Sequence, residues 1–167
     1  GFADTFLGRT AAQWEASTAQ VEELGVRRVI IRSGVVLSRE GGALPLLALP
    51  YRLFVGGPLV SGDQWLPWIH MEDEIRAIRF LVACEAAEGP FNLSAPNPLT
   101  NAQFGRALAR VLERPAFLRV PAPAVRLVLG EMSTVVLDGQ RAIPRRLVDL
   151  GFACHFPEVQ PALCDLL

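Results

Sequence analysis

The spacing of apolar residues along this chain predicts helices that alternate with short strands. From Phe6 to Leu24 apolar residues recur every three or four positions, which is typical of one face of a helix. Gly25 follows and is a natural end for that helix. Val29-Ile30-Ile31 is a short β-branched run of the kind found in a strand buried on both faces. A helix, a glycine turn and a buried strand in succession predict an α/β layer structure rather than a helical bundle.

Further helices and a second strand follow from the same kind of pattern. Leu44 to Phe54 is apolar with two prolines, which predicts a short irregular helix. Residues 74–86 predict a helix that ends near Gly89, and its apolar stripe consists of Ile75, Ile78, Leu81 and Val82. Phe91–Ser94 has the pattern of a second short strand. The loop-rich section from Arg39 to Trp65 is long for a plain connection, so we expect it to help form a pocket.

The last third of the chain has a different character. Thr100 and Gln103 have the spacing of a capping box, which predicts a helix from there to Glu113, before Pro115. Short apolar segments separated by glycine and proline come next, and each predicts a helix: Ala124–Leu129, Met132–Leu137, Pro144–Leu150 and Glu158–Leu167. We therefore expect two regions, an α/β region over residues 1–117 and a small helical domain over residues 118–167.

Composition narrows the classes of function. Hydrophobic residues make up 51% of the chain and charged residues 20%, with a net charge of −1, which argues against disorder and against a nucleic-acid surface. No apolar run approaches the roughly 18 residues that span a bilayer, and no segment has the form of a signal peptide. Three cysteines fit a reducing cytoplasm. We expect a cytoplasmic protein that binds a small molecule and contacts neither nucleic acid nor membrane.

Two kinds of chemistry are disfavoured by the residues present. The chain contains no lysine, so no mechanism that needs a lysine amine is completed by this chain alone. Cys154, His155 and Cys164 match no zinc-ligand spacing, and we expect no metal site.

The segment WLPWIHMEDE, residues 65–74, permits three interpretations. A metal site needs His70 and two carboxylates to converge, but consecutive side chains at a helix start diverge by roughly 100° each. A role in acid or base catalysis needs a partner that the sequence does not locate. In the structural interpretation a strand ends at Trp68-Ile69, His70 packs locally, and Asp73 or a neighbour caps the next helix, whose positive end favours the carboxylates.

Four segments, taken together and in order, resemble a known family. They are VRRVIIRSGVVL, GGPLVSGDQWLPWIHMEDE, GPFNLSAPNPLTNAQFGRALARVL and LGEMSTVVLDGQRAIPRRLVDLGFACHFPEVQPAL. Their order is similar to that in the extended short-chain dehydrogenase/reductase superfamily, within the NAD-dependent epimerase/dehydratase-like family of sugar-nucleotide epimerases, also described as SulA-like. From about Arg119 the chain resembles the small C-terminal domain of unknown function that ends that family.

The resemblance implies that this chain is the carboxy-terminal part of a longer protein. Its fold would be a partial Rossmann-like α/β fold without the N-terminal βαβ cofactor unit, plus a small helical C-terminal subdomain. That unit carries a Gly-x-x-Gly-x-x-Gly loop, and nothing in this chain matches it. The full-length protein would bind NADP or NAD, and this part alone would bind neither tightly. The exposed sheet edge would permit self-association.

The resemblance also assigns positions to the site. Thr10 and Trp14 stand where the superfamily has the tyrosine and lysine of its catalytic Tyr-x-x-x-Lys pair, so the catalytic residues stay unknown and enzymatic activity stays undecided. The strand end Arg32-Ser33-Gly34 would contact the cofactor, and the section 37–65 would face the substrate. The residues at the substrate pocket would be Leu37, Trp65, Trp68, His70 and Asp73.

Two functions are compatible with these assignments. The first is part of an NAD(P)-dependent nucleoside-diphosphate-sugar epimerase-like oxidoreductase, in which this chain supplies substrate-side loops and part of the nicotinamide pocket. The alternative is a non-catalytic NADP(H)-sensing or protein-interaction module. Arg141, Arg145 and Arg146 suit an anionic group such as a phosphate, or equally well ion pairs with nearby acidic residues.

Overall fold

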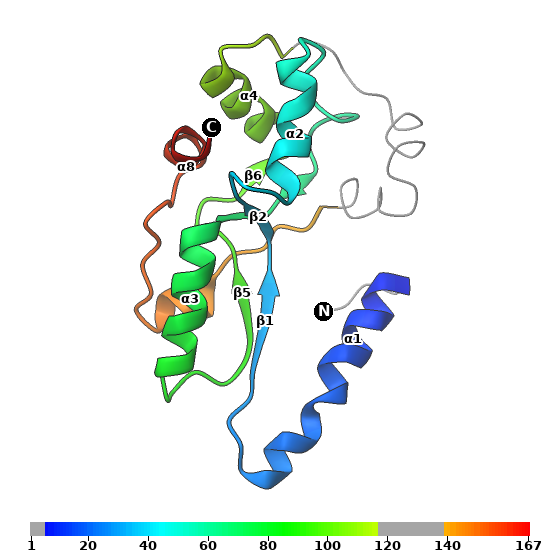
Figure 1. The fold of residues 1–167 in the computed structure, drawn as a ribbon. Coiled ribbons are helices and arrows are strands. Elements are labelled where there is room, and N and C mark those ends of the chain that lie inside the picture. The colour runs from blue at the N-terminus through cyan, green and yellow to red at the C-terminus, as the bar shows by residue number, and fades with distance from the viewer. Residues whose placement is uncertain (1–5, 117–138) are drawn as a thin grey trace.

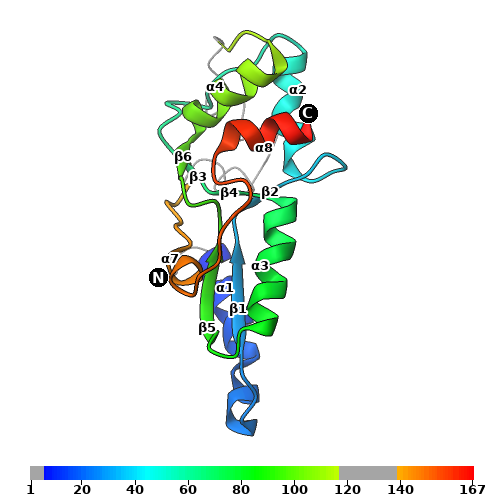
Figure 2. The ribbon, with the colours of Figure 1, turned by 90° about the vertical axis from the view of Figure 1, so that its left-hand side faces the viewer.

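The computed structural model describes residues 6–116 and 139–167. Figures 1 and 2 show an elongated molecule in which the helices α2, α4 and α8 gather at one end and the paired strands β1 and β5 run through the other. The helices are α1 (Phe6–Ser17), the 3-10 helix η1 (Ala19–Leu24), α2 (Ala43–Arg52), α3 (Met71–Ala83), α4 (Asn101–Leu112), α7 (Arg145–Asp149) and α8 (Val159–Leu166). The strands are β1 (Val29–Ser33), β2 (Val35–Leu37), β3 (Trp65–Leu66), β4 (Trp68–His70), β5 (Gly89–Leu93) and β6 (Leu99–Thr100).

The strands of the described residues form three pairs. β1 runs parallel to β5, with Val29 opposite Gly89 and Ser33 opposite Leu93. β2 runs parallel to β4, and β3 pairs antiparallel with β6. Parallel strands joined through helices are the signature of an α/β fold, so the predicted fold class is confirmed.

Gly34 is the point at which the chain changes its partner strand. Its backbone N–H donates to the carbonyl of Leu93 at 2.8 Å, whereas the next N–H, of Val35, donates to the carbonyl of Pro67 at 2.7 Å. A Cβ atom on Gly34 would lie 2.9 Å from the Pro67 carbonyl oxygen and 3.0 Å from its carbon. A glycine is therefore needed here because the backbone of Pro67 occupies the space of a side chain.

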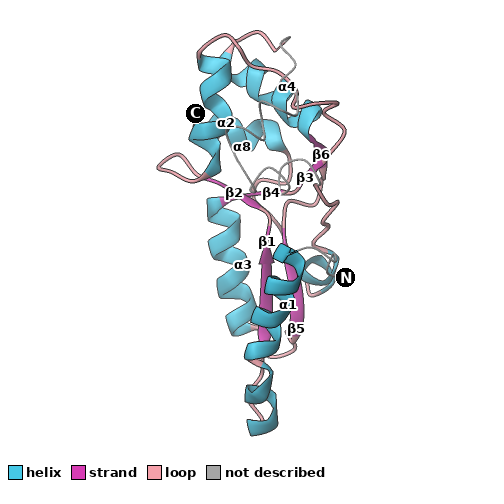
Figure 3. Ribbon diagram, turned by 90° about the vertical axis from the view of Figure 1, so that its right-hand side faces the viewer, coloured by secondary structure: helices cyan, strands magenta, loops and turns pink. Residues whose placement is uncertain are grey.

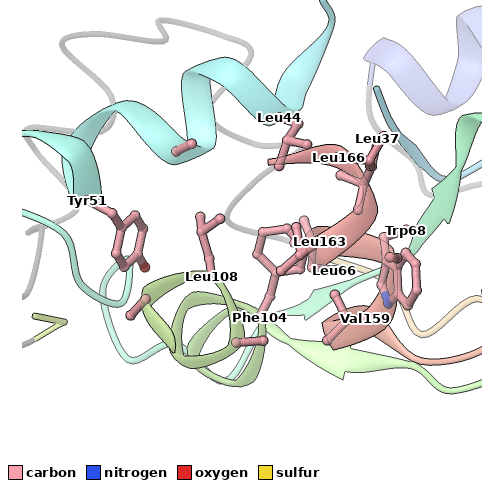
Figure 4. Close-up of a cluster of buried hydrophobic side chains, with 14 of the residues drawn as sticks. Leu37, Leu44, Tyr51, Leu66, Trp68, Phe104, Leu108, Val159, Leu163 and Leu166 are labelled. Carbon is pink, nitrogen blue, oxygen red and sulfur yellow. The ribbon is translucent and has the colours of Figure 1, made fainter. Parts of the chain in front are cut away.

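The core consists of two clusters of buried side chains. One lies between α2, α4 and α8 and includes Trp68 and Phe104 (Figure 4). The other lies between α3, β5 and α7 and includes Phe91 and Leu147. The described part of the predicted small domain contributes to both, through Leu147 and Phe152 in one and Val159, Leu163 and Leu166 in the other. The boundary between residues 117 and 118 stays a prediction.

Several local predictions match the structure. Gly25 ends η1 with a φ of 71°, the left-handed conformation expected of a C-terminal glycine. Thr100 and Gln103 form both hydrogen bonds of a capping box at the start of α4. The predicted helix over residues 6–24 is divided at Thr18, after which the chain continues as the 3-10 helix η1. The predicted helices at 124–129 and 132–137 lie outside the described residues.

The buried face of α3 differs from the predicted stripe. The helix buries Asp73, Glu74, Ala77 and Leu81, whereas Ile75, Ile78 and Val82 are exposed. Relative to the predicted orientation, the helix is rotated about its axis because Asp73 and Glu74 form hydrogen bonds with groups on its buried side, as described below. The predicted apolar stripe was therefore wrong for Ile75, Ile78 and Val82.

The prediction that β1 is buried on both faces was also wrong for this chain. Ile31 is 39% exposed, and the strand carries no fully buried residue. Within the described residues β5 is the one strand bonded to β1, so its other edge is uncovered there. Self-association through this edge stays a prediction. None of the helices in the described residues is long and apolar enough to cross a membrane.

Replacing Gly34 with alanine tests its role in strand packing. The added methyl group would press on backbone that has no rotamer to change, so we expect Gly34→Ala to lower the free energy of unfolding by about 1–3 kcal/mol. Gly41→Ala is the matched control, since a Cβ there meets nothing within 4 Å. Urea denaturation of both variants measures the difference, and equal midpoints would contradict this role.

Candidate functional site

Asp73 is a buried carboxylate that holds the C-terminal segment against α3. Its side chain is 1% exposed. One oxygen, Oδ1, accepts from the backbone N–H of His155 at 2.8 Å and from Arg76 at 2.7 Å, and Oδ2 accepts from the backbone N–H of Phe156 at 2.8 Å. Three donors offset the loss of water around the carboxylate. Asp73 therefore fixes the position of a segment 82 residues further along the chain.

His70 caps α3 and lies against the same segment. Its Nδ1 accepts from the backbone N–H of Glu72 at 3.1 Å, so in the neutral ring the proton resides on Nε2. Nε2 faces Oδ2 of Asp165 at 3.3 Å, and the ring stacks on Phe156 with centroids 4.0 Å apart. Both ring nitrogens of this buried histidine have partners within the protein. The helix cap is thus His70 rather than Asp73, and the geometry is that of the structural interpretation.

The three acidic residues at the start of α3 point to three different places. Glu72 contacts Nδ1 of His155 at 2.6 Å in a pair that is about half exposed. Asp73 binds the backbone of the C-terminal segment, and Glu74 reaches the end of β1. Within the described residues no three potential ligand side chains are grouped so as to hold a metal ion.

Glu74 and Ser33 form a hydroxyl–carboxylate pair at the carboxyl end of β1. The Ser33 hydroxyl donates to Oε1 of Glu74 at 2.5 Å. Ser33 is an exposed residue, whereas Glu74 is 8% exposed, and within residues 6–116 and 139–167 its second oxygen, Oε2, is buried with no hydrogen-bond partner. Burial raises the pKa of Glu74, and the hydrogen bond from Ser33 lowers it by less. The pair thus combines the hydroxyl of an exposed residue with a buried carboxyl group.

The other two residues of the predicted cofactor contact have partners inside the protein. Arg32 binds both oxygens of Glu15, at 2.7 and 2.8 Å, and so holds α1 beside β1 (Figure 3). This bond lowers the pKa of Glu15 and raises that of Arg32. Gly34 approaches the backbone of Pro67. Of the three, Ser33 offers its side chain at the strand end, and contact of the segment with a cofactor stays a prediction.

Thr10 and Trp14 are not arranged as a tyrosine–lysine pair. The Thr10 hydroxyl donates to the backbone carbonyl of Phe6, one turn earlier in α1, at 3.0 Å. Trp14 is 74% exposed. Tyr51, the chain's one tyrosine, is buried in the helical end, and its hydroxyl donates to the carbonyl of Gly57 at 3.4 Å. Within the described residues, neither of these hydroxyls hydrogen-bonds to a residue at the end of β1.

Most residues predicted at the substrate pocket are buried in the core. Leu37, Trp68, His70 and Asp73 are each at most 4% exposed. Trp65 is half-buried beneath the guanidinium of Arg141, which lies 5.1 Å from the ring centroid. In the described residues these side chains support the corner between β4 and α3, and their contact with a substrate stays a prediction.

An open hollow lies elsewhere, between α4 and α8. It encloses about 700 Å³. Its lining comes from the polar side of α4 and the start of α8, and includes Gln103, Arg106, Arg110, Glu158, Gln160 and Cys164. No sequence pattern predicts this hollow, because the two helices are brought together only by tertiary packing.

Arg146 contacts the backbone of the turn before β5. Its guanidinium donates to the carbonyls of Glu88 and Pro90, each at 2.7 Å, and lies 4.4 Å from the centroid of the Phe91 ring. The residue thus closes this turn, and contact of the C-terminal arginines with an anionic group stays a prediction.

Comparison with known proteins shows a match to one domain family and similarity to epimerase family proteins. Residues 120–166 match the family described as Domain of unknown function (DUF1731). An epimerase family protein of Staphylococcus aureus is 49% identical over 162 residues, which cover 97% of this chain and 54% of that protein. The chain therefore spans about half the length of the curated relatives it matches.

Two solved structures share the fold at substantial identity. The human epimerase family protein SDR39U1 (isoform 2), crystallised with NADPH, has a TM-score of 0.80 at 39% identity, covering 84% of this chain and 48% of that one. A nucleoside-diphosphate sugar epimerase of Corynebacterium glutamicum has a TM-score of 0.78 at 31% identity, covering 98% of this chain and 31% of that one. The resemblance to the epimerase and short-chain dehydrogenase/reductase proteins is confirmed, and the chain matches a part of them.

Replacing Asp73 with asparagine tests the attachment of the C-terminal segment. Both carboxylate oxygens of Asp73 accept hydrogen bonds, and in asparagine one of them becomes an NH2 group, which cannot accept from the N–H group that faces it. We therefore expect Asp73→Asn to lower the free energy of unfolding by about 2–4 kcal/mol. Asp149→Asn, at an exposed residue of α7, makes the same change in charge. Urea denaturation distinguishes the two, and similar losses for both variants would show that the buried bonds contribute little.

The reactivity of the cysteines tests the environment beside Asp73. Burial and the Asp73 carboxylate raise the pKa of Cys154 to about 11, while Arg76 opposes the shift. Because the thiolate is the reactive form, we expect iodoacetamide to label the exposed Cys164 well before Cys154 at about pH 8. Peptide mass mapping over time measures both rates, and equal labelling of folded protein would contradict the assigned environment.

Proposed function

We propose that this chain is the carboxy-terminal part of a nicotinamide-dependent, nucleoside-diphosphate-sugar epimerase-like oxidoreductase. In this proposal it supplies part of the nicotinamide pocket and the substrate-side loops. The observation that carries the proposal is the shared end of the parallel strands β1 and β5, where Ser33 is exposed above the buried carboxyl group of Glu74.

The position of this end supports a ligand site. In open α/β sheets ligands bind beyond the carboxyl ends of the strands. Ser33 is the last residue of β1 and Gly34 follows it, while Ser94 and Ala95 follow the end of β5. These small residues leave little side-chain bulk at the strand ends, which suits the close approach of a planar ring.

The residues present fit part of a dinucleotide site. A nicotinamide cofactor accepts or returns a hydride when it is bound, and the strand end Arg32-Ser33-Gly34 would border its nicotinamide ring. The section from Leu37 to Trp65 would face the substrate. No Gly-x-x-Gly-x-x-Gly loop is present in the sequence, so the pyrophosphate would be bound by another part of the full-length protein. NADPH in the human neighbour's crystal supports a phosphorylated dinucleotide.

A second candidate function is cofactor sensing or protein interaction without turnover. The arrangement of α1 favours it, since the Thr10 hydroxyl is directed to the carbonyl of Phe6 and Trp14 is exposed. A site without an acid or base near the nicotinamide would bind the cofactor and leave it unchanged. Tight binding of NADPH with no consumption across a panel of carbonyl compounds would select this function.

Calorimetric titration with NADPH tests the proposed pocket. The full-length protein is expected to bind with a Kd on the order of micromolar, whereas this 167-residue chain alone binds at least about 100-fold more weakly. In the full-length protein, Ser33→Leu should weaken NADPH by about 10-fold or more. The same dinucleotide without its nicotinamide ring should bind that variant as it binds the wild type.

The matched control is Glu85→Leu, at an exposed residue beyond α3. It should leave both affinities unchanged. Micromolar binding to the isolated chain, or equal weakening of both ligands by Ser33→Leu, would contradict the proposal.

A further inference from the structure

We propose that Ser33 and Glu74 form the proton-transfer pair of this site, with Ser33 contacting the substrate and Glu74 receiving the proton behind it. This inference rests on the proposed nicotinamide-dependent function and names the acid and base that the Tyr-x-x-x-Lys positions do not provide. It begins from the hydrogen bond of 2.5 Å between the Ser33 hydroxyl and Oε1 of Glu74.

The two residues differ in access to solvent, as a proton relay requires. Ser33 is an exposed residue at the end of β1, where the proposed substrate would approach its oxygen. Glu74 is 8% exposed, and within the described residues its Oε2 is buried without a hydrogen-bond partner. A structural carboxylate usually has all its oxygens satisfied, as Asp73 does one residue earlier. The unsatisfied oxygen leaves Glu74 able to take up a proton.

The chemistry of the pair follows from its protonation. Burial disfavours the charged form of Glu74 and raises its pKa above that of an ordinary carboxyl group, which makes the carboxylate a stronger base. Because Ser33 donates its proton to Glu74, the lone pairs of the serine oxygen are left to accept a proton from a substrate hydroxyl. A buried carboxylate behind a serine thus makes the serine oxygen a better proton acceptor.

Other side chains that could act as acid or base are already hydrogen-bonded within the protein. Both ring nitrogens of His70 have partners within the protein, and the Thr10 hydroxyl is bonded to the carbonyl of Phe6. The Tyr51 hydroxyl contacts the carbonyl of Gly57 at the helical end. Ser94, at the end of β5, is buried and donates to the carbonyl of Ala142 at 3.4 Å.

The transfer balances in both directions. In oxidation, the C–H bond of a substrate alcohol breaks and its hydride, with both electrons, passes to the oxidised nicotinamide dinucleotide. The substrate O–H bond breaks as a C=O bond forms, and that proton moves to the Ser33 oxygen while the proton of Ser33 moves to Oε1 of Glu74. In reduction, the same hydride and proton return. An epimerisation is the oxidation of the alcohol followed by return of the hydride to the opposite face of the resulting carbonyl group.

The test compares Glu74→Gln with Glu85→Gln in the full-length protein. Glutamine retains a carbonyl oxygen to accept from Ser33 but cannot take up the proton, so we expect NADPH consumption on an accepted carbonyl substrate to fall at least about 100-fold. The Kd for NADPH should change by less than about twofold. Glu85 is exposed, so Glu85→Gln should leave both the NADPH consumption and the Kd for NADPH unchanged. Ser33→Ala should match the loss, and Ser33→Thr, which keeps the hydroxyl, should recover most of the activity.

Each failure has a distinct meaning. A wild type that binds no NADPH would overturn the proposed function itself. A wild type that binds NADPH without turnover would select cofactor sensing over the oxidoreductase and would overturn the pair with it. A Glu74→Gln variant within about threefold of wild-type turnover would overturn only the proton-transfer pair. A parallel loss of NADPH affinity and turnover in Glu74→Gln would assign Glu74 a purely structural role and would also overturn the pair.

A readout without cofactor checks the carboxyl group independently. Since the folded pKa of Glu74 is raised above its ordinary value of 4.5, its contribution to stability is present below that value and is lost as the pH rises through the folded pKa. Glutamine does not ionise, so the stability of Glu74→Gln relative to wild type should increase between about pH 4.5 and about pH 8. A relative stability that stays constant over this range would contradict the raised pKa.

Discussion

The bonds of the buried Asp73 carboxylate connect the parts of this structure. The carboxylate accepts from Arg76 on its own helix and from two groups that are distant in the chain, the backbone N–H groups of His155 and Phe156. Such a group is expensive to bury and stable only when fully bonded, so the helix and the C-terminal segment have one relative position that satisfies it. The stacking of His70 on Phe156 and the contact of His70 with Asp165 reinforce the same position.

The geometry at the strand ends follows from this constraint. With His70 as the cap and Asp73 turned inward, the next residue, Glu74, also lies on the buried side of α3 and meets Ser33. Gly34 then allows the chain to leave β5 and pair with β4, which carries His70 at its end. The hydroxyl of Ser33 is thus positioned by the same corner that holds the C-terminal segment in place.

The sequence predicted features set by local chemistry more successfully than those set by distant contacts. The capping box of Thr100 and Gln103 and the left-handed Gly25 depend on residues a few positions apart, and both are present. The rotation of α3 was mispredicted because Ile75, Ile78 and Val82 form the more apolar stripe, while tertiary bonds of Asp73 and Glu74 decide which face is buried. The pairing of Ser33 with Glu74 spans 41 residues and has no sequence signature. The spacing of Glu74, Ala77 and Leu81 does place these three residues on one helix face, so the sequence could have indicated that Glu74 lies on the buried side of α3.

The chain therefore combines a rigid corner, built by Asp73 and His70, with an accessible strand end at Ser33. We interpret the first as structural support and the second as the reactive side of a nicotinamide site. A crystal structure of the full-length protein with bound NADPH tests this account most directly. The account predicts the nicotinamide ring beyond the carboxyl ends of β1 and β5, with the Ser33 oxygen facing the space above the ring where a substrate binds. A nicotinamide ring bound away from these strand ends, or a Ser33 side chain covered by another part of the protein, would contradict it.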